Sequence, residues 1–326
     1  MSIRDFLFSI TSTRGAPLAR LLFAAALSAS SGTALAQETK APDANGTETV
    51  TASSMEKRQL KQCIECHESY FTIADSKHFV AGDPRTPKGS GKECESCHGD
   101  TSQHNRTPRV KGLVPVTFGQ KAPPGPQNEA CLACHQNGAR MLWQGSTHER
   151  TQQVCANCHK AHTAKDPVVI AETQAGVCFE CHKDRRAEMF RLSTHPLKSG
   201  FMPCSSCHNP HGSTSRSLMV RESVNSTCYT CHAEKRGPFL WEHPPAKDDC
   251  TNCHNPHGTN NASMLKVRQP FLCQQCHQNA FHPSTPYSGL NLPPNVSADK
   301  MLGKACANCH VKVHGSNHPS GARFQR

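Results

Sequence analysis

A mostly irregular fold with short α-helices is what the sequence predicts, and three observations indicate it. Hydrophobic residues make up only 36% of the 326 residues, and the mean hydropathy is −0.59. Pro (23 residues) and Gly (21 residues) are frequent enough to interrupt regular elements throughout. All 20 cysteines fall into one short motif. Such a chain cannot fold around its own side chains alone, so the groups that the cysteines bind must supply the core.

The motif is Cys-x-x-Cys-His, and it occurs ten times. This spacing is the attachment signal for c-type haem, in which two thiols bond to one porphyrin and the following histidine ligates its iron. We therefore predict ten haem c groups per chain. The predicted covalent attachment residues are Cys63, Cys66, Cys94, Cys97, Cys131, Cys134, Cys155, Cys158, Cys178, Cys181, Cys204, Cys207, Cys228, Cys231, Cys250, Cys253, Cys273, Cys276, Cys306 and Cys309. The predicted proximal iron ligands are His67, His98, His135, His159, His182, His208, His232, His254, His277 and His310.

Zinc binding and a disulfide framework are the alternative interpretations of these cysteines. A zinc site joins two Cys-x-x-Cys knuckles or closes with distant histidines, and neither form requires a histidine directly after every second cysteine. A disulfide framework has an even cysteine count, but it has no fixed spacing that recurs ten times. Haem attachment accounts for the cysteines and the histidines together.

A two-motif unit repeats along the chain, clearest between CFECHKDRRAEMFRLSTHPLKSGFMPCSSCHNPHG and CYTCHAEKRGPFLWEHPPAKDDCTNCHNPHG. Each unit contains one haem motif, a histidine after about a dozen residues, a second motif, and a further histidine shortly after it. We call these units modules. The first to fifth modules span residues 63–104, 131–162, 178–212, 228–258 and 273–318.

Porphyrins would supply the apolar surface that this chain lacks. We therefore predict a multihaem cytochrome c with an elongated, haem-packed core and two pentahaem halves, residues 63–199 and 200–326. Residues 131–143 and 178–192 favour short helices, and the Pro-rich residues 105–127 favour a surface loop. No stretch shows the alternation of apolar and polar residues that is typical of a β-strand.

The first 36 residues have the pattern of a secretory signal peptide. Arg4, Arg14 and Arg20 precede or flank the apolar run 21–27, and Ala-Leu-Ala at 34–36 forms a cleavage site. Residues 37–62 are polar and aperiodic, which favours a flexible N-terminal lead. Because haem c is attached outside the cytoplasmic membrane, export agrees with the ten motifs and predicts a periplasmic protein.

Eleven of the 21 histidines lie outside the motifs, whereas ten distal ligands are needed if every iron is held by two histidines. The predicted distal ligands are His78, His104, His148, His162, His195, His211, His243, His257, His282 and His314. His318 is the expected surplus histidine, although His282 competes for that role. A histidine three residues after a motif lies on the proximal side of its own haem, so His162, His211 and His257 must serve neighbouring haems.

The formal net charge of +11 does not indicate nucleic-acid binding. Ten haems would bring twenty propionates, which outnumber the excess positive charge. Many Lys and Arg side chains are therefore expected to pair with propionates. No nucleic-acid partner is predicted.

The ligand count argues for an electron carrier and against an enzyme. A multihaem reductase needs one iron with an open position, often built on a Cys-x-x-Cys-Lys motif, and no such motif occurs. A diffusing periplasmic shuttle is the alternative carrier, although it would need fewer haems. Ten haems in one chain suit transfer over a distance comparable with a membrane of about 40–45 Å.

The motif layout resembles the MtrA/MtoA/DmsE family. The resemblance rests on the two Cys-x-x-Cys-His-Asn-Pro-His-Gly elements, CYTCHAEKRGPFLWEHPP at 228–245, FLCQQCH at 271–277 and HGSNHPSG at 314–321. It covers the chain after the signal and is strongest from residue 178 onward.

This resemblance implies a haem wire that associates with the outer membrane through a β-barrel porin. It also implies partners at both ends: periplasmic or inner-membrane cytochromes on one side, and an extracellular multihaem cytochrome or a mineral on the other. The family transfers electrons in both directions, for oxidation of extracellular Fe(II) or for reduction of extracellular metals or DMSO, and the sequence does not choose between them.

Overall fold

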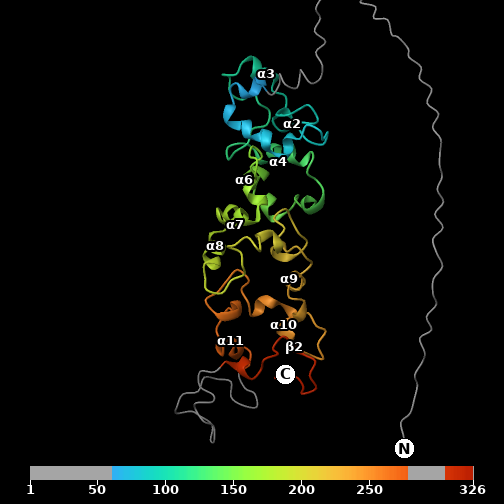
Figure 1. Cartoon of the computed structure of the whole chain (residues 1–326), viewed down its shortest axis with the longest axis vertical. Helices are drawn as coiled ribbons and strands as arrows, with labels where there is room; N and C mark the ends of the chain where they lie inside the picture. Colours follow the sequence, from blue (N-terminus) through green and yellow to red (C-terminus); the bar gives the residue numbers. More distant parts are fainter. Residues whose placement is uncertain (1–60, 278–304, 326) are drawn as a thin grey trace, which may run out of the picture. The chain divides into compact units, whose positions relative to one another are not determined.

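Short helical turns joined by irregular chain make up the described part of the protein (Figure 1). The computed structural model describes residues 61–277 and 305–325, all within one unit that spans residues 50–326. The predicted signal peptide, the predicted lead up to residue 60, and His282 lie outside the described residues.

The α-helices are brief because the haem motifs and the prolines interrupt them. The longest of those described, α4 and α7, have nine residues each. Pro at the first turn starts α4 and α10, where a missing backbone N–H has no cost. The α-helices are α2 (Glu95–His98), α3 (Ser102–Arg106), α4 (Pro124–Leu132), α5 (Thr147–Arg150), α6 (Cys155–Cys158), α7 (Ala171–Phe179), α8 (Lys183–Met189), α9 (Val224–Cys228), α10 (Pro244–Asp248) and α11 (Phe271–Gln274).

Single turns of 3-10 helix fill much of the remaining described chain. Polar side chains cap several of them; Asp166, for example, accepts a hydrogen bond from the backbone N–H of Val168 at the start of η4. The 3-10 helices are η1 (Glu68–Asp75), η2 (Lys77–Phe79), η3 (Gly138–Arg140), η4 (Pro167–Val169), η5 (Cys204–Ser206), η6 (Arg216–Leu218), η7 (Ala233–Lys235), η8 (Cys250–Asn252), η9 (Ala262–Met264) and η10 (Cys306–Asn308).

The haem motif itself is a helical turn in all ten copies. In each copy the backbone N–H of the histidine donates to the carbonyl of the first cysteine, over 2.8–3.1 Å. One turn of helix places residues three and four positions apart on one face. The two cysteines and the histidine of a motif therefore face the same way, as attachment to a single porphyrin requires.

Extended pairing is confined to short contacts in the described residues. Strand β1 (Trp241–Glu242) pairs antiparallel with β2 (Gly315–Ser316), in the register Trp241 with Ser316. Isolated bridges join His208 to Met219 and His254 to Leu265. The sequence predicted no strands, and the two-residue pair is too short to leave an alternating pattern.

The bounds predicted for two helices were wrong. The helix expected at 131–143 lies at 124–132, and the one expected at 178–192 is divided into α7, which ends at Phe179, and α8, which begins at Lys183. The reason is the haem motif between the segments: His182 has φ −86° and ψ 59°, outside the helical region, so that its ring can leave the helix axis.

The described chain has almost no hydrophobic core of its own. Only three hydrophobic side chains are buried, those of Trp143, Val154 and Met189, whereas Leu192 and Phe201 are 89% and 87% exposed. This confirms the prediction of a mostly irregular chain, and it agrees with the low content of apolar residues. No helix in the described ranges is long and apolar enough to cross a membrane.

Candidate haem sites

Nine motif histidines each face a histidine from outside the motifs. The ring centroids of every pair lie 5.9–6.3 Å apart. The pairs are His67 with His104, His98 with His162, His135 with His78, His159 with His211, His182 with His148, His208 with His257, His232 with His195, His254 with His314, and His277 with His243.

This spacing fits one iron between two imidazoles. Two metal–nitrogen bonds of about 2.0–2.1 Å, each extended by roughly 1.1 Å from the nitrogen to the ring centre, place the centroids about 6.3 Å apart. Aromatic rings in direct contact have centroids spread over about 4.5–7 Å, whereas all nine pairs fall within the narrow range of 5.9–6.3 Å. The donor set therefore fits haem iron with two axial histidines.

The histidine pairs connect neighbouring modules in a regular way. A histidine after the second motif of a module faces the second motif histidine of the preceding module, as His257 faces His208. A histidine between two motifs faces the first motif histidine of the following module, as His195 faces His232. Eight of the nine pairs follow these two rules: 162–98, 211–159, 257–208 and 314–254, and 78–135, 148–182, 195–232 and 243–277.

The first module departs from the rules, and the sequence contains no haem motif before Cys63 with which it could pair. Its last histidine, His104, faces His67 of the same module. At the other end, the Nδ1 of His310 lies 2.5 Å from the carbonyl oxygen of Arg323. His282, one of the predicted distal ligands, lies outside the described residues. His318, the expected surplus histidine, accepts a hydrogen bond at Nδ1 from the backbone N–H of Ser320, over 3.1 Å.

Backbone carbonyls orient many of these rings. A bond from Nδ1–H to a carbonyl fixes the tautomer and leaves Nε2 free for a metal. Such pairs are His98 with Val116 (3.0 Å), His148 with Pro210 (2.7 Å), His195 with Pro256 (2.9 Å), His208 with Ser217 (2.8 Å) and His254 with Ser263 (2.7 Å). His159 differs, because its Nδ1 lies 2.6 Å from the carboxylate of Asp166.

Burial adds to this preference for neutral rings. It lowers the pKa of several distal histidines: His162, His211, His243, His257 and His314. A histidine that binds a metal must be neutral at the ligating nitrogen, so a lowered pKa favours the competent form.

Three glycines next to distal histidines allow close approach between modules. Gly212, Gly258 and Gly315 have φ angles of 123°, 133° and 137°, a region that side chains disfavour. A Cβ at these positions would overlap Leu142, Glu188 and Phe239, each in the preceding module or next to its motifs. The glycines thus let the distal histidine segment of one module lie against the module before it.

Buried amides hold the two motifs of a module together, and sequence reasoning missed them. Asn225 accepts a hydrogen bond from the backbone N–H of Cys250 over 2.8 Å and donates to the carbonyl of Lys247. Two further buried amides, Asn128 and Gln174, and the half-buried Gln269 play the same part for Cys155, Ser205 and Ala307. The signal in the sequence is an Asn or Gln three or four residues before the first cysteine of a module.

The cysteines show that consecutive motifs are neighbours. Within each module the two first cysteines contact each other: 63 with 94, 131 with 155, 178 with 204, 228 with 250, and 273 with 306. In the first of these contacts, the hydrogen bond with Cys94 lowers the pKa of Cys63 to about 7. These contacts link the first motif of a module to its second.

Second cysteines provide the links between modules. Burial raises the pKa of Cys97, and the nearby Cys134 of the next module adds to the effect. The same cause and the same neighbour relation hold for 158 with 181, 207 with 231, and 253 with 276. Together with the contacts inside the modules, these relations join all ten motifs in chain order.

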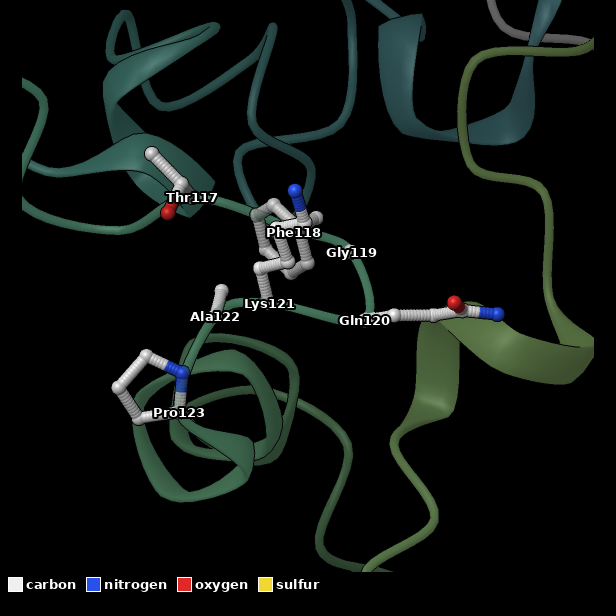
Figure 2. A pocket seen from close by; sticks show the side chains of 7 residues that line it. All are labelled: Thr117, Phe118, Gly119, Gln120, Lys121, Ala122 and Pro123. Carbon is white, nitrogen blue, oxygen red and sulfur yellow. The ribbon is translucent and has the colours of Figure 1, made fainter. Parts of the chain in front are cut away.

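The loop predicted at 105–127 contributes to the second haem position and continues into α4. Phe118 packs edge-on against His98, with ring centroids 5.3 Å apart. The loop is held by Gln127, which is 2% exposed and bonds to the backbone of Gly119. Residues 117–123 line a cavity of about 390 Å³, and Figure 2 shows their side chains. Its walls come from this loop alone, and no motif histidine lines it.

The division into pentahaem halves after residue 199 stays a prediction. The third module lies across this boundary, and the bond between Gln174 and Ser205 crosses it.

Comparison with known proteins identifies relatives that carry the same kind of motif. The chain is 48% identical to the multiheme cytochrome MtrA of Shewanella baltica over 271 residues, which cover 81% of this chain and 80% of that protein. It is 29% identical to the cytochrome c-type protein NrfB of Haemophilus influenzae, over 38% of this chain and 59% of that protein. It is 25% identical to the C-type polyheme cytochrome OmcB of Geobacter sulfurreducens, over 62% of this chain and 25% of that protein.

Three protein families match parts of the chain. The doubled CXXCH motif matches residues 195–237 and 243–282. The NrfB-like cytochrome c-type proteins match residues 94–176, and the cytochrome c554 and c-prime family matches residues 26–99. The two doubled-motif matches begin at His195 and His243, the histidines between two motifs. The matched unit is thus offset by half a module from the repeat read in the sequence.

Proposed function

The chain belongs to the MtrA family of multihaem cytochromes and binds haem c through its ten motifs, and from this premise we propose that it conducts electrons across an outer membrane within a porin partner. The proposal places the protein in the periplasm. It covers both directions of transfer, for oxidation of extracellular Fe(II) or for reduction of extracellular metals or DMSO. The alternative is a soluble periplasmic shuttle.

The observation that carries the proposal is the unbroken succession of the ten motifs. Contacts between first cysteines link each odd-numbered motif to the next motif, and the neighbouring second cysteines link each module to the following one. Each bound haem would accept and release one electron at its iron. The chain's own residues hold these sites side by side in sequence order, as transfer along a row requires.

The proposed iron ligands are the ten motif histidines and the ten predicted distal histidines. Support comes from the nine pairs with centroids 5.9–6.3 Å apart. For the tenth iron we propose His310 and His282. The first module has a similar arrangement, because His104 faces a motif histidine of its own module, His67. His318 is then the surplus histidine.

With two histidines on every iron, no position is open for a substrate. We therefore propose a carrier and not a reductase, since catalysis on a haem or metal needs an open coordination site. The shared membership with MtrA, an electron-transfer cytochrome, supports the carrier class.

The proposed partners follow from the family. A β-barrel porin would enclose the chain in the membrane, because a haem protein with exposed polar backbone needs a sheath there. Periplasmic or inner-membrane cytochromes would exchange electrons at one end, and an extracellular multihaem cytochrome or a mineral would do so at the other. No nucleic-acid partner is proposed.

Vesicles with an internal reductant and an external Fe(III) acceptor test the proposal. The cytochrome and its porin together should pass electrons without a diffusible mediator, whereas either protein alone should not. External Fe(II) with an internal oxidant should reverse the current.

The alternatives predict different results. If the cytochrome carried electrons only between soluble partners, and never through the porin, the shuttle interpretation would replace the conduit. Rapid turnover of a small substrate by the free cytochrome would support a reductase.

A further inference from the structure

The second motif histidines of the five modules differ in what holds their outer nitrogen. In four modules a neutral backbone carbonyl lies 2.5–3.0 Å from Nδ1, and in the second module a carboxylate takes its place. The four carbonyl pairs are His98 with Val116, His208 with Ser217, His254 with Ser263 and His310 with Arg323. The carboxylate is that of Asp166, whose Oδ2 lies 2.6 Å from Nδ1 of His159.

Asp166 is held firmly in this position. Its other oxygen, Oδ1, accepts hydrogen bonds from the backbone N–H groups of Lys160 (3.1 Å) and Val168 (3.4 Å). The side chain is only 19% exposed. The Nζ of Lys160 donates to the carbonyl of Ala156 and not to this carboxylate. The carboxylate is therefore fixed against His159 and weakly screened by solvent.

The opposite ring at this haem position has no such partner. His211 faces His159 at 6.0 Å between centroids, and its buried Nδ1 has no hydrogen-bond partner among the described residues. An effect of hydrogen bonding on this iron would therefore come from the Asp166 side.

A carboxylate acts on a metal-bound imidazole more strongly than a carbonyl does. The charge-assisted bond draws the Nδ1 proton toward the carboxylate and leaves more electron density on Nε2, which faces the metal. A more basic ligand and a nearby negative charge both stabilise ferric iron over ferrous iron, which lowers the reduction potential.

A second carboxylate, near the sixth haem position, provides a contrast. Glu188 lies 3.6 Å from Nδ1 of His257, beyond hydrogen-bond distance. Its oxygens are taken by Arg185 at 2.5 Å and by Asn255 at 2.9 Å. The positive charge of Arg185 offsets the negative charge of Glu188. The electrostatic effect of this carboxylate on His257 is therefore much smaller.

We propose that Asp166 is a positioning residue that acts through His159 to give the fourth haem the lowest reduction potential of the five second haems. This rests on the proposed ligation of the fourth iron by His159 and His211. On reduction of the protein, the fourth haem would then accept an electron after the second haems of the other four modules.

The test uses the full-length exported protein with ten haems, verified by intact mass, and the variant Asp166→Asn. Asparagine keeps an oxygen that can accept from Nδ1–H but removes the charge. Potentiometric titration followed by electron paramagnetic resonance should show one of ten haems becoming easier to reduce, with a changed low-spin signal. A tenfold change in that one-electron equilibrium corresponds to about 59 mV.

Two matched variants control for charge alone. Asp83→Asn removes a carboxylate that pairs with Arg85 over 2.7 Å and should leave all ten midpoints in place. Glu188→Gln should move the sixth haem less than Asp166→Asn moves the fourth. Equal shifts in all three variants would overturn the proposal, because they would show only an effect of net charge.

Two further outcomes would also overturn it. Unchanged midpoints in Asp166→Asn would show that the carboxylate does not tune the iron. A new high-spin signal would show that Asp166 only keeps His159 on the metal. A high-spin iron in the unmodified protein would instead contradict the ligation proposed above, which the same spectrum tests separately.

Discussion

The first module and the interior modules differ in which histidines face their motif histidines. In the interior, each module receives histidines from both neighbours, as the third module does when His148 faces His182 and His257 faces His208. In the first module, His104 turns back to His67 of the same module. The difference follows from position, because a terminal module has only one neighbour with which to exchange histidines.

Under the proposed ligation, the iron of an interior module would link two modules. Removal of such a histidine should affect both one haem and the attachment of one module to the next. Removal of a terminal histidine should affect one haem only. The comparison therefore separates the role of a histidine as a ligand from its role as a connection.

The largest effect is expected for His257→Ala. The sixth iron would lose its distal ligand, and the fourth module would lose a contact with the third. One of ten haems should become high-spin in the oxidised protein, and the thermal unfolding midpoint should fall. Electron paramagnetic resonance and thermal unfolding followed by haem absorbance measure the two effects.

His104→Ala is the matched control at the end of the chain of modules. It should also produce one high-spin haem, but it should lower the unfolding midpoint less, because no contact between modules is lost. An equal fall in both variants would show that exchanged histidines do not connect modules more strongly than others.

A smaller effect is expected for Gly258→Ala, which changes the contact without removing a ligand. The φ angle of 133° is strained for alanine, and its Cβ would overlap the carbonyl oxygen of Glu188. The cost should be about 1–3 kcal/mol, the usual range for a strained backbone position. Denaturant unfolding measures it, with Gly176→Ala in α7 as the control.

Gly176 has open space around its Cα and lies within a helix, where alanine is favoured over glycine. Its substitution should be neutral or stabilising. If Gly258→Ala were as stable as Gly176→Ala, close approach between the third and fourth modules would not depend on the glycine.

Asn225→Ala should weaken the inside of one module and leave its links to neighbours intact. The change removes the bonds to the backbone of Cys250 and Lys247 from a buried position, at an expected cost of about 1–3 kcal/mol. All ten haems should stay low-spin. Asn105→Ala, which loses a single 3.4 Å bond, should cost less. A high-spin signal in Asn225→Ala would contradict the assignment of this amide to the module interior.

The smallest effect is expected for His318→Ala. The ring of His318 bonds locally to Ser320, and the carbonyl that accepts from Trp241 Nε1 belongs to the backbone and is kept. The spectrum should be unchanged, whereas His282→Ala should produce one high-spin haem. The reverse pair of results would exchange the roles proposed for the two histidines.

Local chemistry was readable from the sequence because it depends on residues that are close along the chain. The spacing of Cys63, Cys66 and His67 is a property of one helical turn, and the bond from the histidine N–H to the first cysteine carbonyl recurs in all ten motifs. The scarcity of apolar residues likewise predicted a chain without its own core, and Trp143, Val154 and Met189 are the few hydrophobic side chains that it buries among the described residues.

The pairing of histidines was decided only by the tertiary structure. The sequence indicated that His162, His211 and His257 must serve other haems, but it did not say which, since spacing does not reveal how modules pack. The packing depends on contacts between distant residues, such as Gly258 with Glu188.

The contact between Asp166 and His159 was likewise revealed only by the tertiary structure. Asp166 lies seven residues after the motif histidine, and only the fold of the short loop and η4 turns its carboxylate back to Nδ1. Haem count, attachment residues and the need for a cofactor core were therefore determined by the sequence itself. The order in which haems share histidines, and the charge placed against one of them, required long-range packing that local pattern does not encode.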